Sequence, residues 1–425
     1  MEELLDDPKS AAALEKLIYS LNNNYVHWDK FKDMHLDVGG DRLAIWQRAV
    51  SERAQVSGRS LSFPGLEMSW WLSNSVESQL HKLDIALAGG RGMEAWLEGK
   101  YAHRHKTAAL LDETIASAQL AGAAVSKKAA KEMLLKKRIP QNTNEQLCIN
   151  IFKTLQAGSA EAGAPLTESS LLQLHQSLTK DTIRLKAIGS YRTNQKIDNS
   201  ALDLSYGYKP KAPREIPHLM SLVFELYNND AEPFFIHPIV KAALIHYLVV
   251  TIRPFKDGNG RMARLLAQLY LLKKDYWLMS YLSVSNVIAK FKPQYHKVLA
   301  QSQSDANNPG YFIHFYIQSL QMAYQSLKSL VARLSKERVE KNENRLPGFN
   351  ERQTAVLQWV KEDASKMVTI RELRSVYGVS KETARTDLAA LVEKGALQFY
   401  HINKKTYAFV KGDGFEHIIN TASQS

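Results

Sequence analysis

Cysteine is almost absent from the sequence, because Cys148 is the single thiol in 425 residues. One thiol excludes an internal disulfide framework and any zinc site built from several cysteines. Long apolar runs are also lacking, since the longest candidate, 239–252, contains Lys241 and His246, and this excludes a membrane-spanning helix. The acidic start, Met-Glu-Glu-Leu-Leu-Asp-Asp, lacks the basic residues and apolar core of a secretory signal. We therefore expect a cytoplasmic protein without a membrane partner.

The charge balance is basic, with 55 Lys and Arg against 43 Asp and Glu and a net charge of +12. Such an excess suits DNA, phosphate-bearing substrates or an acidic partner, and charge alone does not choose among them. Hydrophobic residues make up 45% and charged residues 23%, which is the composition of a folded chain. At roughly 150 residues per domain, the length predicts about three domains.

Helical periodicity dominates the chain, so we expect a mainly α fold. The first hundred residues hold five of the seven tryptophans, which suits packing inside a core or between domains. Between 189 and 213 the pattern loosens into Gly, Asn, Asp, Tyr and Pro, as in a short β-hairpin or flap. The expected organisation is a helical N-terminal module (1–106), a helical core (107–335), a charged linker (336–349), a small unit (350–411) and a tail (412–425).

The small unit has the pattern of a winged helix-turn-helix. Asn350 and Ser380 are placed to cap its first and third helices. Two short β patterns follow, at 396–401 and 406–410. Three helices followed by a two-stranded ribbon are the order of a winged helix.

The most informative stretch is residues 251–264, Thr-Ile-Arg-Pro-Phe-Lys-Asp-Gly-Asn-Gly-Arg-Met-Ala-Arg. Gly258 and Gly260 allow positive φ and close backbone approach. Together with Asn259 they can aim successive N–H groups into one concavity, where a helix N-terminus adds positive potential.

Charged side chains complete this pattern. Arg261 and Arg264 are three residues apart on the helix that follows, so they share a face and offer two forks to phosphate oxygens. Asp257 is an acceptor able to hold Mg²⁺ on those phosphates. The stretch predicts a nucleotide di- or triphosphate site. The alternative is an ordinary helix–helix turn whose arginines form surface ion pairs.

The same stretch resembles the signature of Fic-domain proteins, His-Pro-Phe-x-Asp/Glu-Gly-Asn-Gly-Arg-x-x-Arg. Residues 253–264 match every specified position except the first. Flanking segments are similar as well, since 189–195 resembles the lead-in to the family's flap and 237–247 the helix before the motif. The resemblance covers about 107–335.

The resemblance implies a Fic-type helical core that binds ATP with Mg²⁺ and transfers AMP to a hydroxyl side chain of a target protein. Residues 196–208 would form the flap that lays a target segment alongside as a strand. The target is not readable from the sequence, and a homodimer is left open. By position, the resemblance assigns the α- and β-phosphates to Gly258, Asn259, Gly260 and Arg261, the γ-phosphate to Arg264 and the metal to Asp257.

Position 253 departs from the family, because Arg253 stands where relatives carry their histidine. That histidine takes the proton from the attacking hydroxyl, which needs a base with a pKa near neutrality. Arginine stays protonated at physiological pH and cannot accept the proton. Nucleotide binding can survive while transfer fails. A weaker departure is Phe291, where relatives carry an asparagine near the base, so the preferred base stays open.

A second departure concerns an inhibitory helix that many relatives carry, with the pattern Ser/Thr-x-x-x-Glu-Gly/Asn. Its glutamate pairs with the last arginine of the loop. Here Ser117, Ala121 and Gly122 fit the pattern with alanine at the glutamate's place, and an ordinary alanine-rich helix is the alternative. On the first interpretation Arg264 lacks its restraint. The two departures fit natural degeneration or two engineered substitutions.

The small C-terminal unit resembles bacterial winged-helix regulators of the DeoR-like type over 378–395. A net charge of only +2 over 350–425 is weak for a strong DNA binder, and winged helices also serve as docking or dimerisation modules. DNA binding and docking both stay open. The residues expected to face DNA are Lys381, Thr383, Arg385 and Thr386 on the third helix, with Lys404 and Lys405 at the wing tip.

Three functions remain compatible with the sequence. The chain is a Fic-type enzyme that transfers AMP or a related nucleotide moiety, a silenced relative that binds nucleotide and regulates through its winged helix, or an interaction protein without nucleotide binding. The intact loop from Asp257 to Arg264 argues against the third. Arg253 favours an impaired or silent protein.

Overall fold

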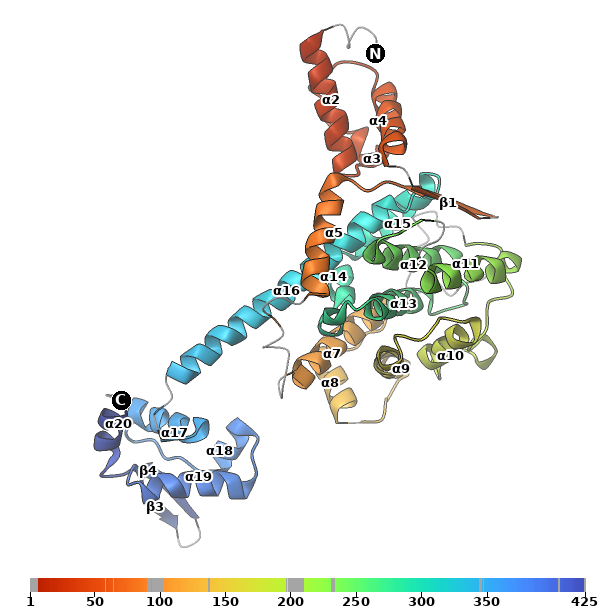
Figure 1. Ribbon diagram of the computed structural model, residues 1–425. Helices are drawn as coiled ribbons and strands as arrows, with labels where there is room; N and C mark the ends of the chain where they lie inside the picture. The colour runs from red at the N-terminus through yellow and green to blue at the C-terminus, as the bar shows by residue number, and fades with distance from the viewer. Residues whose placement is uncertain are drawn as a thin grey trace. The chain divides into compact units, whose positions relative to one another are not determined.

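The chain forms two compact units, residues 1–329 and 330–425, which are coloured from red to blue in Figure 1. Both are mainly helical, as the sequence predicts, and in the described residues each carries one small hairpin sheet. In the part of the chain described, no helix is long and apolar enough to cross a membrane. The computed structural model describes residues 7–57, 59–63, 65–89, 93, 102–136, 138–195, 197, 210–230, 234–343, 346, 348–403 and 406–423.

The N-terminal part of the first unit contains a hairpin that the sequence analysis did not predict. Strands β1 (Arg59–Phe63) and β2 (Leu66–Trp70) pair antiparallel, and β2 alternates buried and exposed residues. The alternating pattern of β2 covers only five residues and stands among stronger helical patterns, so the sequence analysis missed it. Tryptophans pack as expected, since Trp28 and Trp46 join an apolar cluster and Trp70 is buried. The helices here are α2 (Pro8–Asn23), α3 (Trp28–Phe31), α4 (Arg42–Ser57) and α5 (Asn74–Leu87).

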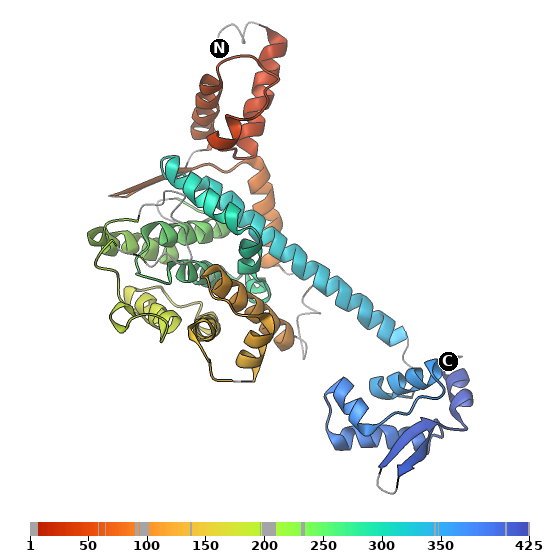
Figure 2. The same ribbon diagram turned by 180° about the vertical axis from the view of Figure 1, so that it is seen from behind.

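The rest of the first unit is a helical core around α12 (Pro238–Ile252), which packs against α11 (Ile216–Asn228) and α13 (Asn259–Lys273). Pro238 occupies the first turn of α12, where its missing N–H costs nothing. Every residue of α12 from Ile239 to Ile252 is buried, and both views show the helix surrounded by others (Figure 2). The buried Lys241 places its Nζ 2.6 Å from the carbonyl oxygen of Asn229, to which it donates. A rigid, apolar helix therefore leads into the 253–264 loop.

Other helices of this unit enclose that core. The expected boundary near residue 106 falls inside a helix, because α7 begins at Ala102. The elements are α7 (Ala102–Leu120), α8 (Lys127–Leu135), α9 (Thr143–Ala160), α10 (Glu168–Thr179), η2 (Leu185–Ala187), η4 (Pro213–Glu215), η5 (Trp277–Tyr281), α14 (Val284–Lys290), α15 (Lys292–Ser304) and α16 (Gly310–Glu343). Since α16 extends to Glu343, half of the segment expected as linker is helical.

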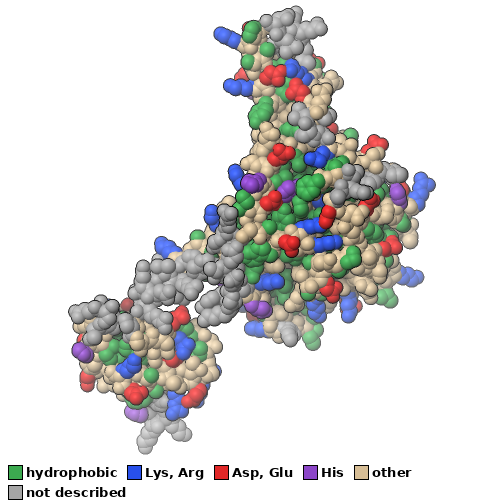
Figure 3. Space-filling view, viewed as in Figure 1, with side chains coloured by type: hydrophobic (Ala, Val, Ile, Leu, Met, Phe, Trp, Pro, Cys, Tyr) green, Lys and Arg blue, Asp and Glu red, His purple; other side chains and the backbone are tan. Residues whose placement is uncertain are grey.

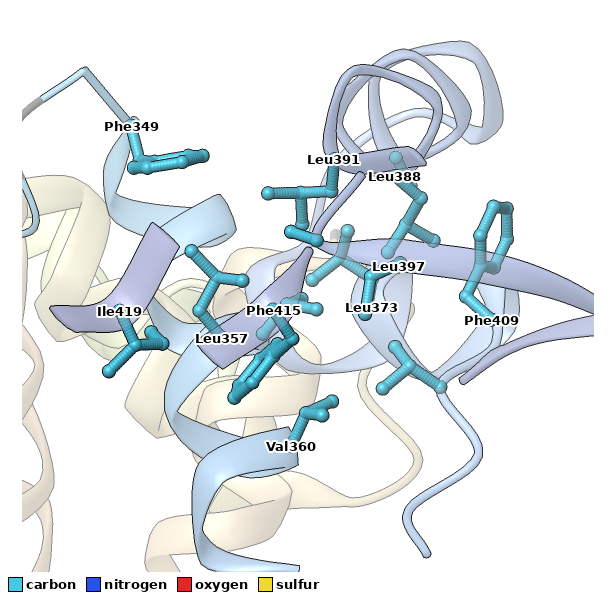
Figure 4. Packing of buried hydrophobic residues seen from close by; sticks show 14 residues of the cluster. Phe349, Leu357, Val360, Leu373, Leu388, Leu391, Leu397, Phe409, Phe415 and Ile419 are labelled. Atoms are coloured by element: carbon cyan, nitrogen blue, oxygen red, sulfur yellow. The ribbon is translucent and has the colours of Figure 1, made fainter. Parts of the chain in front are cut away.

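The C-terminal unit has the order of a winged helix, and its apolar core appears in Figure 4. Asn350 and Ser380 cap the first and third helices as predicted, and Gly378 makes the turn between helices with a φ of 64°. Phe415, in the segment expected as a tail, is buried in this core. The elements are α17 (Glu351–Glu362), α18 (Ile370–Tyr377), α19 (Lys381–Glu393), β3 (Leu397–Asn403), β4 (Thr406–Lys411) and α20 (Phe415–Ser423).

Candidate functional site

Residues 253–258 join the buried C-terminus of α12 to the N-terminus of α13. Together with the first six residues of α13 they form the stretch called the 253–264 loop. Gly258 is the N-cap of α13, with a φ of 87°, and offers no side chain to the first turn. A helix that begins here has no carbonyl partners for its first N–H groups, so the amides of Asn259, Gly260 and Arg261 face the loop. The dipole of α13 adds positive potential at the same point. The backbone is therefore arranged as an anion-binding site.

Arg253 begins the loop in the left-handed region, with a φ of 49°, and its residue surface is 1% exposed. Its carbonyl oxygen accepts from Nε of Arg192 at 2.7 Å, and the amide of Arg192 donates to the carbonyl of Pro254 at 2.9 Å. Burial lowers the pKa of Arg192, and the charge of Arg253 lowers it further. The sequence pointed to Arg253 but assigned no role to Arg192, which clamps the loop from the 189–195 segment.

Asn259 uses its side chain to close the loop. Its Oδ1 accepts from the amide of Phe255 at 2.9 Å, and its Nδ2 donates to the carbonyl of the same residue at 2.8 Å. The carboxamide thus satisfies both backbone groups of a buried residue. The backbone amide of Asn259 and the second N–H of its Nδ2 remain as donors for an anion.

Asp257 and Arg261 form an ion pair across the first turn, with 2.7 Å between Oδ2 and Nη2. The other oxygen of Asp257 accepts from the amide of Gly258 at 2.6 Å, and Nη1 of Arg261 donates to the carbonyl of Leu178 at 3.0 Å. The side chain of Arg261 is only 2% exposed, whereas that of Asp257 is 31% exposed. Arg261 therefore orients the carboxylate, and the carboxylate faces solvent.

Asp257 also fits a metal-binding role by its chemistry. Each carboxylate oxygen accepts one hydrogen bond within the loop and keeps further acceptor capacity. In the described part of the chain, no group of three or more His, Cys, Asp or Glu is placed to hold a metal. Mg²⁺ at Asp257 would therefore take its other ligands from phosphate oxygens and water, which is its usual habit.

His175 on α10 belongs to the site, although the sequence analysis did not select it. Its ring stacks on Phe255 with 3.8 Å between centroids and 7° between planes. Nδ1 accepts from the amide of Gly189 at 3.0 Å, and Nε2 lies 3.0 Å from the carbonyl oxygen of Asp257. Burial lowers the pKa of His175 to about 4, so the ring is neutral and Nε2 carries the proton.

Arg264 is held by α7, which corrects the expectation that it lacks a restraint. Its Nε donates to Oγ of Ser117 and its Nη2 to the carbonyl of Ser117, each at 3.0 Å. The amide of Ala121 donates to the same carbonyl at 3.2 Å, and Gly122, with a φ of 89°, follows the end of α7. The 117–122 segment thus lies beside the last arginine of the loop. Ser117 makes the contact with Arg264, and residue 121 supplies no carboxylate because it is alanine.

Glu113, one turn before Ser117, is a second residue that the sequence analysis missed. It is buried, and its carboxylate accepts from the amide of Ser285 at 2.9 Å, from the hydroxyl of Ser285, and from the hydroxyl of Ser283 at 3.2 Å. Burial raises the pKa of Glu113, while these hydrogen bonds and the charge of Arg264 lower it. Glu113 therefore fastens α7 to the start of α14, and this fixes Ser117 against Arg264.

Some of the remaining predicted residues lie in the described part of the chain and others lie outside it. Phe291 lies between α14 and α15 and is 41% exposed. The expected flap, 196–208, lies outside the described residues except for residue 197. Lys404 and Lys405 at the wing tip lie outside them as well.

Three of the four residues predicted to face outward on α19 are exposed, namely Lys381, Arg385 and Thr386. Thr383 is half-buried, and its Oγ1 lies 2.9 Å from Oγ of Ser380. The inward face of α19 carries Asp387, which is buried and bonded to α17. An outward basic edge on a firmly held helix is the arrangement of a recognition helix.

Basic residues do not gather in one patch on the face seen in Figure 3, where Lys and Arg alternate with Asp and Glu.

Comparison with known proteins identifies both regions. Residues 165–271 match the Fic/DOC family, and residues 352–401 match the DeoR-like helix-turn-helix domain. The chain is 43% identical over 70 residues to protein adenylyltransferase Fic of Culex quinquefasciatus, which covers 16% of this chain and 14% of the relative. The Drosophila melanogaster protein of that name is 33% identical over 111 residues, 26% of this chain and 21% of the relative. The chain thus spans about a fifth or less of these relatives.

Two solved structures share the fold at low identity. A Fic family protein from Desulfovibrio desulfuricans has a TM-score of 0.53 and 19% identity, over 79% of this chain and 94% of that one. Fic-1 from C. elegans has a TM-score of 0.51 and 15% identity, over 69% of this chain and 78% of the other. These likenesses concern the fold alone.

Proposed function

The chain carries a Fic/DOC domain and a DeoR-like helix-turn-helix domain, and from these we propose that it binds ATP with Mg²⁺ at the 253–264 loop while Arg253 suppresses transfer of AMP. The single observation that carries the proposal is the loop itself. Its uncapped helix N-terminus, Asp257 and Arg264 suit a magnesium nucleotide, whereas a buried arginine occupies the family's base position.

Phosphate binding follows from the charges around the concavity. The first-turn amides of α13 and the dipole of that helix favour an anion. Arg264 also favours a bound anion, because its guanidinium lies across the first turn of α13. A Cβ built on Gly260 would lie 3.3 Å from the Nη1 of Arg264. In relatives the resemblance assigns this arginine to the γ-phosphate. Asp257 would hold Mg²⁺, which neutralises phosphate charge when bound.

Transfer of AMP to a hydroxyl requires a group that accepts the hydroxyl proton. A guanidinium is a donor only, so Arg253 cannot accept that proton at physiological pH. Loss of a general base costs about 10²–10⁴-fold in rate. The proposed state is therefore a nucleotide complex that turns over slowly or not at all.

Calorimetry with the full chain tests nucleotide binding. We expect ATP to bind with Mg²⁺, and Arg264→Ala to weaken ATP binding about 10–100-fold, the scale of one or two charge-assisted hydrogen bonds. ADP binding should weaken less, because ADP lacks the γ-phosphate. Lys274→Ala is the matched control, since Lys274 pairs with Asp230 away from the loop. No binding at millimolar ATP would refute the proposal.

A second candidate function is DNA binding by the C-terminal unit, favoured by the exposed Lys381 and Arg385 on α19. The bound nucleotide would then serve a regulator. A duplex of random sequence should bind with an affinity that falls steeply with salt and is lost in Lys381→Ala/Arg385→Ala. Lys361→Ala, an exposed lysine of α17, is the control. Unchanged binding in the double variant, or none at low salt, would favour the docking role.

A further inference from the structure

We infer that His175 is a positioning residue that couples the phosphate loop to the 189–195 segment. Nucleotide binding at the loop therefore changes the hydrogen bonding of the Gly189 amide. This inference rests on the proposed nucleotide binding. The imidazole makes both connections itself, because Nδ1 accepts from Gly189 and Nε2 donates to Asp257.

The ring has no freedom to make these bonds in another way. His175 is 0% exposed, and its stacking on Phe255 fixes the plane of the imidazole. The amide of Gly189 can only donate and the carbonyl of Asp257 can only accept, so one neutral tautomer satisfies both. A shift of either backbone group therefore breaks a buried hydrogen bond or moves the other group with it.

The loop side of this bridge lies next to the proposed phosphate site. The carbonyl of Asp257 precedes Gly258, the N-cap of α13. A Cβ on Gly258 would meet the His175 ring at 3.5 Å and Thr179 at 3.2 Å, so α10 sits tightly against this turn. Anions that bind the first-turn amides must therefore act on a backbone that His175 already holds.

Arg192 adds a second connection between the same two segments. Its guanidinium donates to the carbonyls of Arg253 and Asn194 at 2.7 and 3.0 Å, and to that of Lys211. The loop is thus tied to the 189–195 segment at its first and fifth residues. His175 is the better test of the coupling, because a neutral ring can be replaced without changing charge.

Amide hydrogen exchange at Gly189 measures the coupling directly. In the unaltered full chain, saturating ADP with Mg²⁺ should slow exchange of this amide. His175→Phe keeps the stacking ring but loses both hydrogen bonds. It should speed exchange at Gly189 about tenfold, abolish the response to nucleotide, and weaken ADP binding about tenfold, the loss of one hydrogen bond. His175→Asn retains an acceptor near Nδ1 and should recover part of the protection.

The control variant is His314→Phe, since His314 is also buried but lies on α16, where its ring contacts Tyr25. It should leave both readouts unchanged. Bound ADP with no effect on Gly189 exchange in the unaltered chain would overturn the inference, and this outcome needs no variant to fold. Wild-type ADP affinity in a folded His175→Phe protein would overturn it as well. Absence of ADP binding in the unaltered chain would instead refute the proposed function on which it rests.

Discussion

Asn259 closes the loop with both ends of its carboxamide, one on the amide and one on the carbonyl of the buried Phe255. A hydrogen-bond donor and an acceptor are needed at once, which only an amide side chain of this length supplies. The signature asparagine is thus explained by backbone geometry as much as by any ligand.

Substitution of Asn259 should therefore damage the fold and the site together. Asn259→Ala leaves two buried backbone groups unsatisfied and should lower the free energy of unfolding by about 2–4 kcal/mol. Asn259→Asp keeps the acceptor for the Phe255 amide but sets an oxygen against the carbonyl, so it should also destabilise. Denaturant unfolding measures both. An Asn259→Asp protein as stable as the parent would show that the bond to the carbonyl contributes nothing.

The identity of the loop residues could be predicted from the sequence, because the whole motif is contiguous. Their partners could not, because these come from distant segments. His175 lies 82 residues before Asp257, and Ser117 lies 147 residues before Arg264. No local periodicity carries such pairings. The sequence analysis therefore did not foresee that Ser117 holds the guanidinium of Arg264.

At the scale of elements, α7 acts as a clamp on the end of the loop. Glu113 fixes the helix to α14, and Ser117 holds the guanidinium of Arg264. Arg264 as a whole residue is 8% exposed, so little solvent competes for the hydrogen bonds of its guanidinium. Arg264 must exchange part of this pairing for a γ-phosphate if ATP binds as proposed.

Loosening this clamp should favour the nucleotide. Ser117→Ala removes the hydroxyl but keeps the carbonyl partner, so Arg264 should retain one of its two bonds to α7. We expect tighter ATP binding by roughly two- to tenfold, since a competing hydrogen bond of about 0.5–1.5 kcal/mol is gone. Calorimetry on both proteins checks this. Weaker ATP binding in Ser117→Ala would mean that the serine orients Arg264 for phosphate.

Element boundaries show where sequence signals suffice. The N-caps Asn350 and Ser380 are found because a capping side chain bonds within three residues of itself. The β1–β2 hairpin is missed because its strands are too short to give a clear alternating pattern. Their burial depends on packing against other parts of the chain. Helix α20 is missed because its core residues, Phe415 and Ile419, form a single i, i+4 pair, which is too short a periodic signal.

At the scale of the whole molecule, buried neutral histidines make the first unit sensitive to acid. Burial, and then the charge of Arg53, lower the pKa of His314 to about 3, from 6.5 in an unfolded chain. Between these values the unfolded chain binds a proton that the folded one does not. Stability is therefore complete above about pH 6.5 and falls as the pH drops toward 3.

The change should be measurable by unfolding at several pH values. One such histidine contributes a slope of up to about 1.4 kcal/mol per pH unit between pH 6 and 4. His314→Phe cannot take up that proton and should show a shallower decline than the parent. Identical slopes in the two proteins would show that the folded protein protonates His314 normally.

The two compact units have separate apolar cores and should unfold in separate calorimetric transitions. Leu388→Ala creates a cavity in the C-terminal core and should destabilise that unit by about 2–5 kcal/mol without changing ATP affinity. The matched variant Leu248→Ala, in α12, should lower the other transition. A single transition shifted by both variants would mean that the units unfold as one.

The central claim is that the loop binds nucleotide while Arg253 prevents transfer, and incorporation of labelled AMP from ATP tests it most directly. The parent and Arg253→Ala should label neither themselves nor lysate proteins. Arg253→His should label, because imidazole can accept the hydroxyl proton and histidine tolerates the positive φ of this position better than most residues. Strong labelling by the parent, or equal labelling by the alanine and histidine variants, would contradict the account.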